Sequence, residues 1–136
     1  MIMPEYLIDT NTCIYLTKQK PPKVVDKFRQ LKTGAVAMSV ICYGELYFGN
    51  EKSEHPKRSH DALEALIGVI PVLSMPQEAA KHYGHIRAYL QKKGKIIGNN
   101  DLWIAAHCLT LGITLVTNNT KEFQRVPKLR IENWVH

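Results

Sequence analysis

The chain has 136 residues, of which 45% are hydrophobic and 22% charged, proportions typical of one soluble globular domain covering residues 1–136. Its start, MIMPEYLIDTN, lacks the basic and apolar regions of a signal peptide, and its apolar runs are too short to cross a bilayer. We therefore expect a cytoplasmic protein without membrane contact. The formal net charge of +6 and the pI of about 9.3 favour a polyanionic partner such as nucleic acid.

Short apolar runs alternate with helical patterns along the chain. The runs predict strands at Tyr6–Ile8, Val36–Met38, Val69–Leu73, Ile113–Val116 and Leu129–Ile131. The helical patterns include one that follows a Ser39 N-cap, one from Gln77 to Lys93 and one from Asn100 to Leu111. This alternation predicts an α/β fold, with a small, mainly parallel sheet of about five strands flanked by helices on both faces.

Polar side chains follow three of the predicted strands at the point where each strand ends. They are Asp9, Thr10 and Asn11 after the first strand, Ser39 after the second, and Thr117, Asn118 and Asn119 after the fourth. The carboxyl ends of parallel strands point the same way, and open α/β sheets bind their ligands there. We therefore expect these side chains to gather at one edge of the sheet.

Two further carboxylates are expected at this edge. Asp101 falls in the first turn of a largely apolar helix, where Asn99 or Asn100 would be the N-cap. A carboxylate in a first turn often does no more than stabilise its helix, so that reading stays open for Asp101. Glu45 lies within the apolar segment ICYGELYFG, where a charge is costly unless it is paired or ligated. A salt bridge to a lysine is its alternative explanation.

Asp9 has two readings as well, since it either caps the next helix or holds something that is not protein. Three carboxylates at one edge repel each other, and a divalent cation removes that repulsion. Oxygen ligands suit Mg²⁺ or Mn²⁺. A carboxylate-bound Mg²⁺ on a basic protein is suited to phosphodiester hydrolysis. Competing motifs are lacking, since the sequence has no Gly-rich phosphate loop and no G-x-S-x-G segment.

Four segments of the sequence resemble those of PIN-domain ribonucleases, specifically the VapC toxins of bacterial toxin–antitoxin pairs. The segments are LIDTNTCIYL, MSVICYGELYFG, IGNNDLWIAAHCL and LVTNNTKEFQRVPKLRIENW, in that order along the chain. By this resemblance, Asp9, Glu45 and Asp101 match the acidic positions that hold Mg²⁺ or Mn²⁺. The resemblance also implies cleavage of structured RNA, in particular initiator tRNA in its anticodon region. A VapB-type antitoxin and a second copy of the chain are the implied partners.

The chain departs from the wider family pattern after LVT, where many relatives have an acidic residue and this chain has Asn118 and Asn119. Glu122 is the nearest acid and resembles a fourth catalytic position. Thr10, Asn11 and Thr117 are expected to orient carboxylates or water, and Asn118 is expected to reach the same site.

Two alternatives to a metal-dependent endoribonuclease remain open. A PIN-like module could bind RNA or a protein partner without cutting, and a related nuclease could act on DNA. Cleavage that needs a divalent metal, compared on RNA and DNA, separates the three.

Overall fold

The computed structural model describes residues 3–136. Its elements in chain order are β1 (Tyr6–Ile8), α1 (Thr10–Lys18), α2 (Pro22–Arg29), β2 (Val36–Ser39), α3 (Val40–Glu51), α4 (Pro56–Ile67), β3 (Val72–Leu73), α5 (Ala79–Lys93), α6 (Asn99–Leu111), β4 (Thr114–Val116), α7 (Thr120–Phe123) and β5 (Ile131–Glu132). The strands form one sheet in the order β3-β2-β1-β4-β5, and each pairing is parallel. The predicted α/β class and parallel sheet are therefore confirmed.

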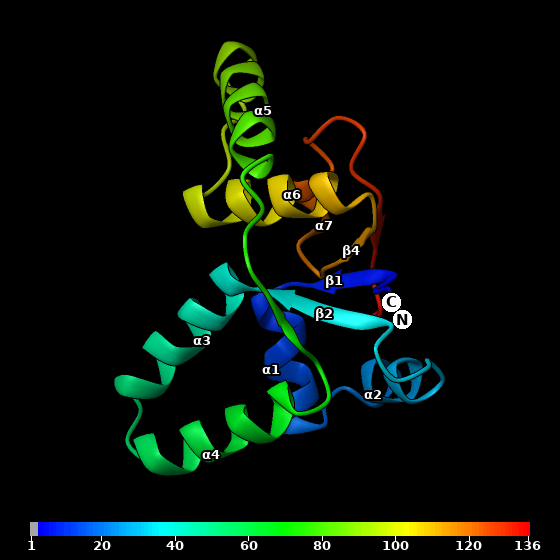
Figure 1. The fold of residues 1–136 in the computed structure, drawn as a ribbon, viewed down its shortest axis with the longest axis vertical. Helices are drawn as coiled ribbons and strands as arrows, with labels where there is room; N and C mark the ends of the chain where they lie inside the picture. Colours follow the sequence, from blue (N-terminus) through cyan, green and yellow to red (C-terminus); the bar gives the residue numbers. More distant parts are fainter. Residues whose placement is uncertain (1–2) are drawn as a thin grey trace.

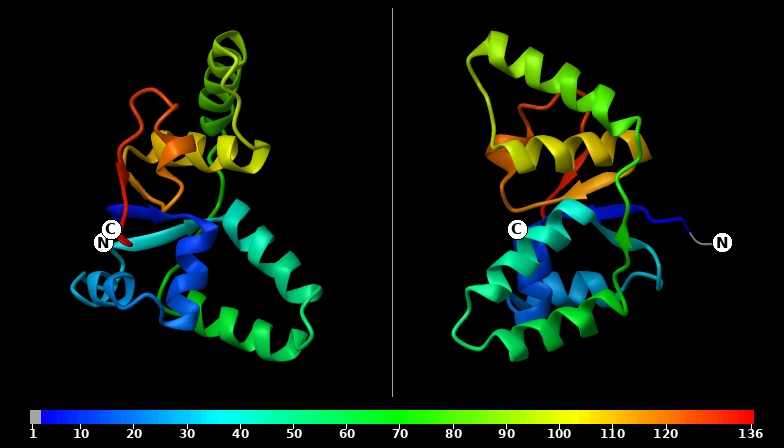
Figure 2. Two further views of the ribbon diagram at one scale, coloured as in Figure 1. Left: turned by 180° about the vertical axis from the view of Figure 1, so that it is seen from behind. Right: turned by 60° about the vertical axis from the view of Figure 1, so that its left-hand side comes forward.

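Strand β1 lies at the centre of the sheet because its residues are apolar enough to be covered on both sides. Leu7 and Ile8 are fully buried, and β1 pairs with β2 on one side and with β4 on the other. Helices α1, α2 and α4 lie on one side of the sheet, and α5 and α6 lie on the other (Figures 1 and 2). The prediction of helices on both faces of the sheet is thus confirmed.

Four predicted strands differ from the observed ones in their bounds. The second strand runs one residue further than predicted, to Ser39. The predicted strand at Val69–Leu73 contains only Val72–Leu73, since the N–H groups of Val69 and Ile70 both donate to the Leu66 carbonyl in the turn that ends α4. The fourth strand starts one residue later than predicted, at Thr114. The last strand lies at Ile131–Glu132, rather than at Leu129–Ile131.

Helix starts also differ slightly from the prediction. Helix α5 begins at Ala79, after a turn in which the Ala79 N–H donates to the Pro76 carbonyl, and not at Gln77. Gly98 is the N-cap of α6, so Asn99 and Asn100 are helical residues and neither is the predicted cap. The Ser39 cap is confirmed, because its hydroxyl accepts from the Ile41 N–H at 3.1 Å.

The carboxyl edge of the sheet is where the chain places its helix starts. Helices α1 and α3 begin directly after β1 and β2, and the first turn of α6 lies at the same edge (Figure 1). The residues that end β1, β2 and β4 therefore share this edge with the first turn of α6. Within residues 3–136, no helix is long and apolar enough to span a bilayer.

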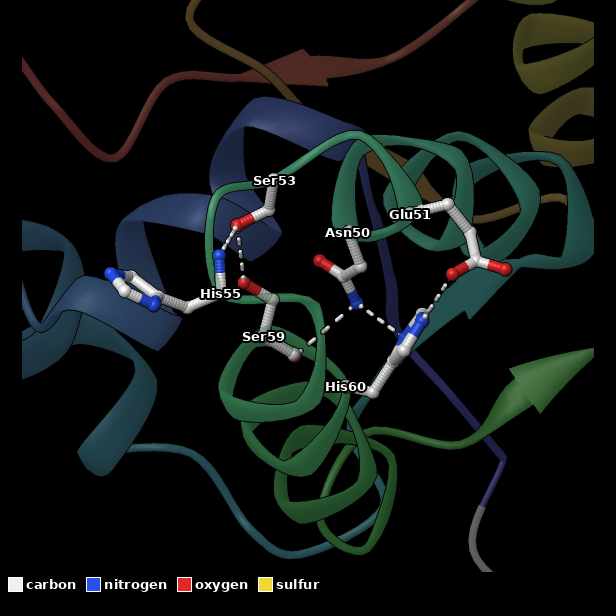
Figure 3. A network of polar contacts seen from close by, with 6 residues as sticks. All are labelled: Asn50, Glu51, Ser53, His55, Ser59 and His60. Atoms are coloured by element: carbon white, nitrogen blue, oxygen red, sulfur yellow. Dashed lines mark hydrogen bonds and ion pairs between the residues drawn. The ribbon is translucent and has the colours of Figure 1, made fainter.

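A polar network closes the turn between α3 and α4 (Figure 3). Asn50 donates from Nδ2 to the Ser59 carbonyl at 3.2 Å and lies 3.1 Å from His60 Nδ1, while His60 Nε2 lies 3.1 Å from Glu51 Oε2. Because the Asn50 amide donates to Nδ1, Nε2 is the ring nitrogen placed to donate to the Glu51 carboxylate. The network holds α3 beside α4, and with α1 they line a groove of about 430 Å³ that includes Glu45.

Candidate metal-binding and active site

Asp9 is held rigidly at the edge of the sheet. It is the N-cap of α1, where Oδ1 accepts from the Thr12 N–H at 2.9 Å, and Oδ2 accepts from the Thr117 hydroxyl at 2.6 Å. The side chain is 5% exposed. A carboxylate offers about four lone-pair sites, so each oxygen keeps one for a further partner. The capping reading of Asp9 is thus confirmed, and capping leaves room for a cation.

Glu45 is oriented by hydrogen bonds rather than by a lysine. The Thr10 hydroxyl donates to Oε1 at 2.5 Å, and Asn100 Nδ2 donates to Oε2 at 3.3 Å. None of the ion pairs formed within residues 3–136 includes Glu45, so the salt-bridge explanation is wrong for this part of the chain. Helices α1, α3 and α6 therefore meet at this one carboxylate.

Asp101 and Glu122 lie within hydrogen-bonding reach of each other. Burial raises the pKa of Asp101 to about 7, and the contact with Glu122 and the negative charges of Glu122, Glu45 and Asp9 add to that shift. Asp101 therefore lies near enough to the three other predicted acidic residues to be affected by their charges. A cation is the group that would relieve this repulsion.

The supporting residues are only partly those that the sequence predicted. Thr10 and Thr117 contact Glu45 and Asp9, as expected. Asn11, by contrast, is exposed on the first turn of α1. Asn118 is also exposed, and its amide contacts are with Tyr15, at 3.4 Å, and Asn133, at 3.1 Å, instead of with a carboxylate.

Two amide side chains contact the acids in a way that was not predicted, since Asn119 was expected only to lie at this edge and Asn100 only as a possible helix cap. Asn119 Nδ2 donates to Glu122 Oε2 at 3.0 Å, and Asn100 contacts Glu45. The signal available in the sequence is the Asn-Asn pair beside each acid, in GNND and TNNTKE. Each pair contains one residue that contacts a carboxylate.

The donor set suits a hard cation that keeps much of its water. All four acidic groups offer oxygen, which Mg²⁺ and Mn²⁺ prefer. As the side chains lie, no three acidic, histidine or cysteine groups within residues 3–136 are close enough to hold one ion together. Mg²⁺ usually binds through one or two carboxylates and several waters, so it does not need three side-chain ligands at one point.

A buried contact ties the two helices of the site to each other. Ser39 and His107 are both 0% exposed, and Ser39 Oγ lies 2.9 Å from His107 Nδ1. Ser39 caps α3, which carries Glu45, and His107 lies on α6, which carries Asp101. Burial lowers the pKa of His107, which keeps the ring neutral. The contact therefore fixes the distance between the helices that carry these two acids.

Comparisons with known proteins show the family to which this chain belongs. The PIN-domain family model matches residues 6–129. Ribonuclease VapC2 of Haemophilus influenzae is 44% identical over 133 residues, which are 98% of this chain and 100% of the relative. The chain belongs to the VapC family of PIN-domain ribonucleases. A second VapC relative, the tRNA(fMet)-specific endonuclease VapC of Salmonella typhimurium, is 42% identical over 97% of this chain and 99% of its own length.

Solved VapC structures have the same fold. DNA-bound VapBC from Salmonella typhimurium matches with a TM-score of 0.91 and 41% identity, over 97% of this chain and 99% of that chain. VapBC2 from Rickettsia felis, bound to a DNA fragment from its promoter, matches with a TM-score of 0.89 and 37% identity, over 95% of this chain and 98% of that chain. The VapC fold thus covers nearly all of this chain.

Proposed function

We propose that this VapC chain is the endoribonuclease toxin of a toxin–antitoxin pair and that it hydrolyses phosphodiester bonds with the help of Mg²⁺ or Mn²⁺. The observation that carries this proposal is that Asp9, Glu45 and Glu122 all lie near enough to Asp101, at the carboxyl edge of a parallel sheet, for their charges to act on it. A binding module would have no use for neighbouring carboxylates whose charges add to the raised pKa of Asp101 in a protein of formal net charge +6.

The residues divide into ligands and residues that hold ligands. Asp9 and Asp101 are the proposed principal ligands, Glu45 binds directly or through water, and Glu122 shares the site with Asp101. When bound, the cation would lower the pKa of water to give hydroxide and would neutralise charge on the phosphoryl oxygens. Thr10 and Thr117 fix Glu45 and Asp9 in single orientations, which keeps their oxygens aimed at the cation.

The proposed substrate is tRNA, with initiator tRNA as the first candidate. Support comes from the relatives named tRNA(fMet)-specific endonuclease in Salmonella typhimurium and Shigella flexneri, which are 42% and 41% identical to this chain. The test is incubation of purified protein with initiator tRNA, elongator tRNA and DNA of matched sequence, with Mn²⁺ and with EDTA. Metal-dependent cleavage of initiator tRNA alone is expected. Equal cleavage of DNA would support the rival nuclease, and no cleavage of any substrate would support the binding module.

A VapB-type antitoxin is the proposed protein partner, since the similar solved structures include VapBC complexes. The groove between α1, α3 and α4 is the proposed seat for an apolar segment of it. Ile14, Leu46 and Leu63 line this groove, and Lys18 and Arg58 add positive charge. Glu45 lies in the same groove, so a bound segment would block the active site. The homodimer and the cytoplasmic location stay predictions, and light scattering on the pure protein tests the former.

A further inference from the structure

An arginine lies close to the acidic site on a rigid aromatic support. Tyr83 of α5 and Trp103 of α6 stack with ring centroids 3.9 Å apart and an interplanar angle of 13°. Arg87 lies one turn beyond Tyr83, with its guanidinium carbon 5.9 Å from the Tyr83 ring centroid, and Nη1 donates to the Tyr83 hydroxyl at 2.8 Å. The stack therefore restricts where the guanidinium can go.

Polar contacts connect this arginine to the catalytic carboxylates. The Tyr83 hydroxyl donates to Asn99 Oδ1 in the first turn of α6. The next residue, Asn100, donates to Glu45, and Asp101 follows it in the chain. The guanidinium thus lies two hydrogen bonds from the helix turn that carries Asp101.

The charge of Arg87 is not neutralised by the part of the chain that the structure describes. Arg87 is exposed, and none of the ion pairs within residues 3–136 includes it. One of its five N–H donors is used by Tyr83, which leaves donors for a second partner. A guanidinium with free donors suits a phosphate, which it can bind through two parallel hydrogen bonds.

The aromatic rings are better placed to support the arginine than to stack on a base. One face of Tyr83 is covered by Trp103, and Arg87 lies against the ring as well. Trp103 is partly buried, and Tyr83 takes up one of its faces. A base would have to displace this stack, whereas a phosphate needs only the free edge of the guanidinium.

We propose that Arg87 binds a backbone phosphate of the RNA beside the bond that is cut, with Tyr83 and Trp103 as positioning residues. This inference rests on the proposed function, because it assumes that RNA lies across the acidic site. The alternative is that Arg87 only braces α5 against α6. A brace would alter thermal stability when removed, whereas a phosphate contact would alter the salt dependence of RNA binding.

The test measures tRNA binding to an Asp101→Asn background at several salt concentrations and cleavage kinetics in the active protein. Arg87→Gln should weaken binding by about tenfold and reduce the slope of log affinity against log salt by about 0.7. KM should rise, with kcat within about twofold of wild type. Arg87→Lys should recover part of the affinity, since it keeps the charge but loses the fork. Arg29→Gln, an exposed arginine on α2 at the other side of the sheet, is the matched control and should change neither quantity.

The inference and the proposed function fail in different ways. If the wild-type protein cleaves tRNA and Arg87→Gln has the slope and the KM of Arg29→Gln, the phosphate contact is wrong while the nuclease stands. If Arg87→Gln lowers the unfolding temperature and leaves the salt slope unchanged, Arg87 is a brace and the inference is overturned. If the wild-type protein does not cleave RNA, the proposed function fails, and a slope unchanged by Arg87→Gln would then overturn the inference too.

Discussion

Asp101 and Glu122, 21 positions apart in the chain, lie within hydrogen-bonding reach of each other at the carboxyl edge of the sheet. Helix α6 supplies one and the single turn of α7 supplies the other. Because burial and this contact raise the pKa of Asp101 to about 7, the metal-free site retains, at mildly acidic pH, a proton that an exposed aspartate would lose. Repulsion between two carboxylates this close lowers the stability of the metal-free protein, and a bound cation would relieve it.

The stability of the metal-free protein should therefore depend on pH through Asp101. The unfolded chain loses the proton near the ordinary aspartate pKa of about 3.9, and the folded chain loses it near 7. Between these values the folded state binds more protons, so this contribution falls as pH rises and is fully lost above about 7. Urea unfolding in EDTA measures the free energy of unfolding of both proteins. The value for Asp101→Asn should rise relative to that for wild type from pH 4 to pH 7, and the difference should be constant above pH 7.

His107 changes stability with pH in the opposite direction. The measurement is therefore the difference in free energy of unfolding between Asp101→Asn and wild type, and not the pH dependence of the wild type alone. Its pKa is lowered by burial, so the unfolded chain takes up a proton first, and stability falls as pH drops below about 6.5. Both proteins share this loss. A difference in free energy of unfolding between Asp101→Asn and wild type that is the same at pH 4 and pH 8 would contradict the raised pKa of Asp101.

The hydroxyl of Thr10 should matter because it fixes Glu45. Thr10→Val keeps the shape and removes the 2.5 Å hydrogen bond, and cleavage should slow by about tenfold or more. Thr17→Val is the matched control, since it removes a hydroxyl that bonds the Cys13 carbonyl on the same helix. Initial cleavage rates at saturating tRNA compare the two. Equal rates for both variants would mean that Glu45 needs no fixed orientation.

Adjacent asparagines should differ in effect. Asn119→Ala removes the amide that contacts Glu122, whereas Asn118→Ala removes contacts with Tyr15 and Asn133. We expect the first change to weaken Mn²⁺ binding by roughly tenfold, because it frees a carboxylate that the amide orients. The second should stay within about twofold of wild type. Calorimetric titration with Mn²⁺ measures both, and the reverse order would show that Asn118 and not Asn119 serves the site.

The groove beside Glu45 should bind the antitoxin and not the RNA. Ala62→Arg places a large side chain in the groove, and Ala65→Arg places the same side chain elsewhere on α4. Ala62→Arg should weaken the complex with the cognate antitoxin by at least about tenfold, because the arginine side chain occupies space that the antitoxin segment would fill. The rate of cleavage should not change. Surface plasmon resonance with the antitoxin gives the affinities. Antitoxin binding that is equal in the two variants would place the partner on another surface.

The sequence predicts the strands of the sheet well and the residues at which they begin and end less well. Continuous apolar runs mark β1, β2 and β4, because strands that are covered on both faces bury nearly all of their side chains. Val69 and Ile70 are apolar too, but their N–H groups complete the turn after α4, and pattern alone cannot distinguish an apolar turn from a strand.

The acidic residues could be predicted, whereas their partners could not. A carboxylate after a strand or within an apolar helix is costly, so Asp9 and Glu45 stand out in the sequence. Which neighbour orients each acid depends on side-chain directions across helices, and these arise only when α1, α3 and α6 pack together. Asn118 and Asn119 are chemically the same, and only the turn before α7 decides which of them meets Glu122.

The central claim is that Asp9 and Asp101 hold a catalytic cation, and the most direct measurement is tRNA cleavage by single-site variants at saturating Mn²⁺. Asp9→Asn keeps a capping side chain, and Asp101→Asn removes the charge that opposes folding, so both should fold as wild type by circular dichroism. We predict that each variant loses at least about a hundredfold in rate, a barrier increase of about 2.7 kcal/mol or more, and that EDTA abolishes the wild-type activity. An Asp101→Asn protein that cleaves tRNA at the wild-type rate would contradict the central claim.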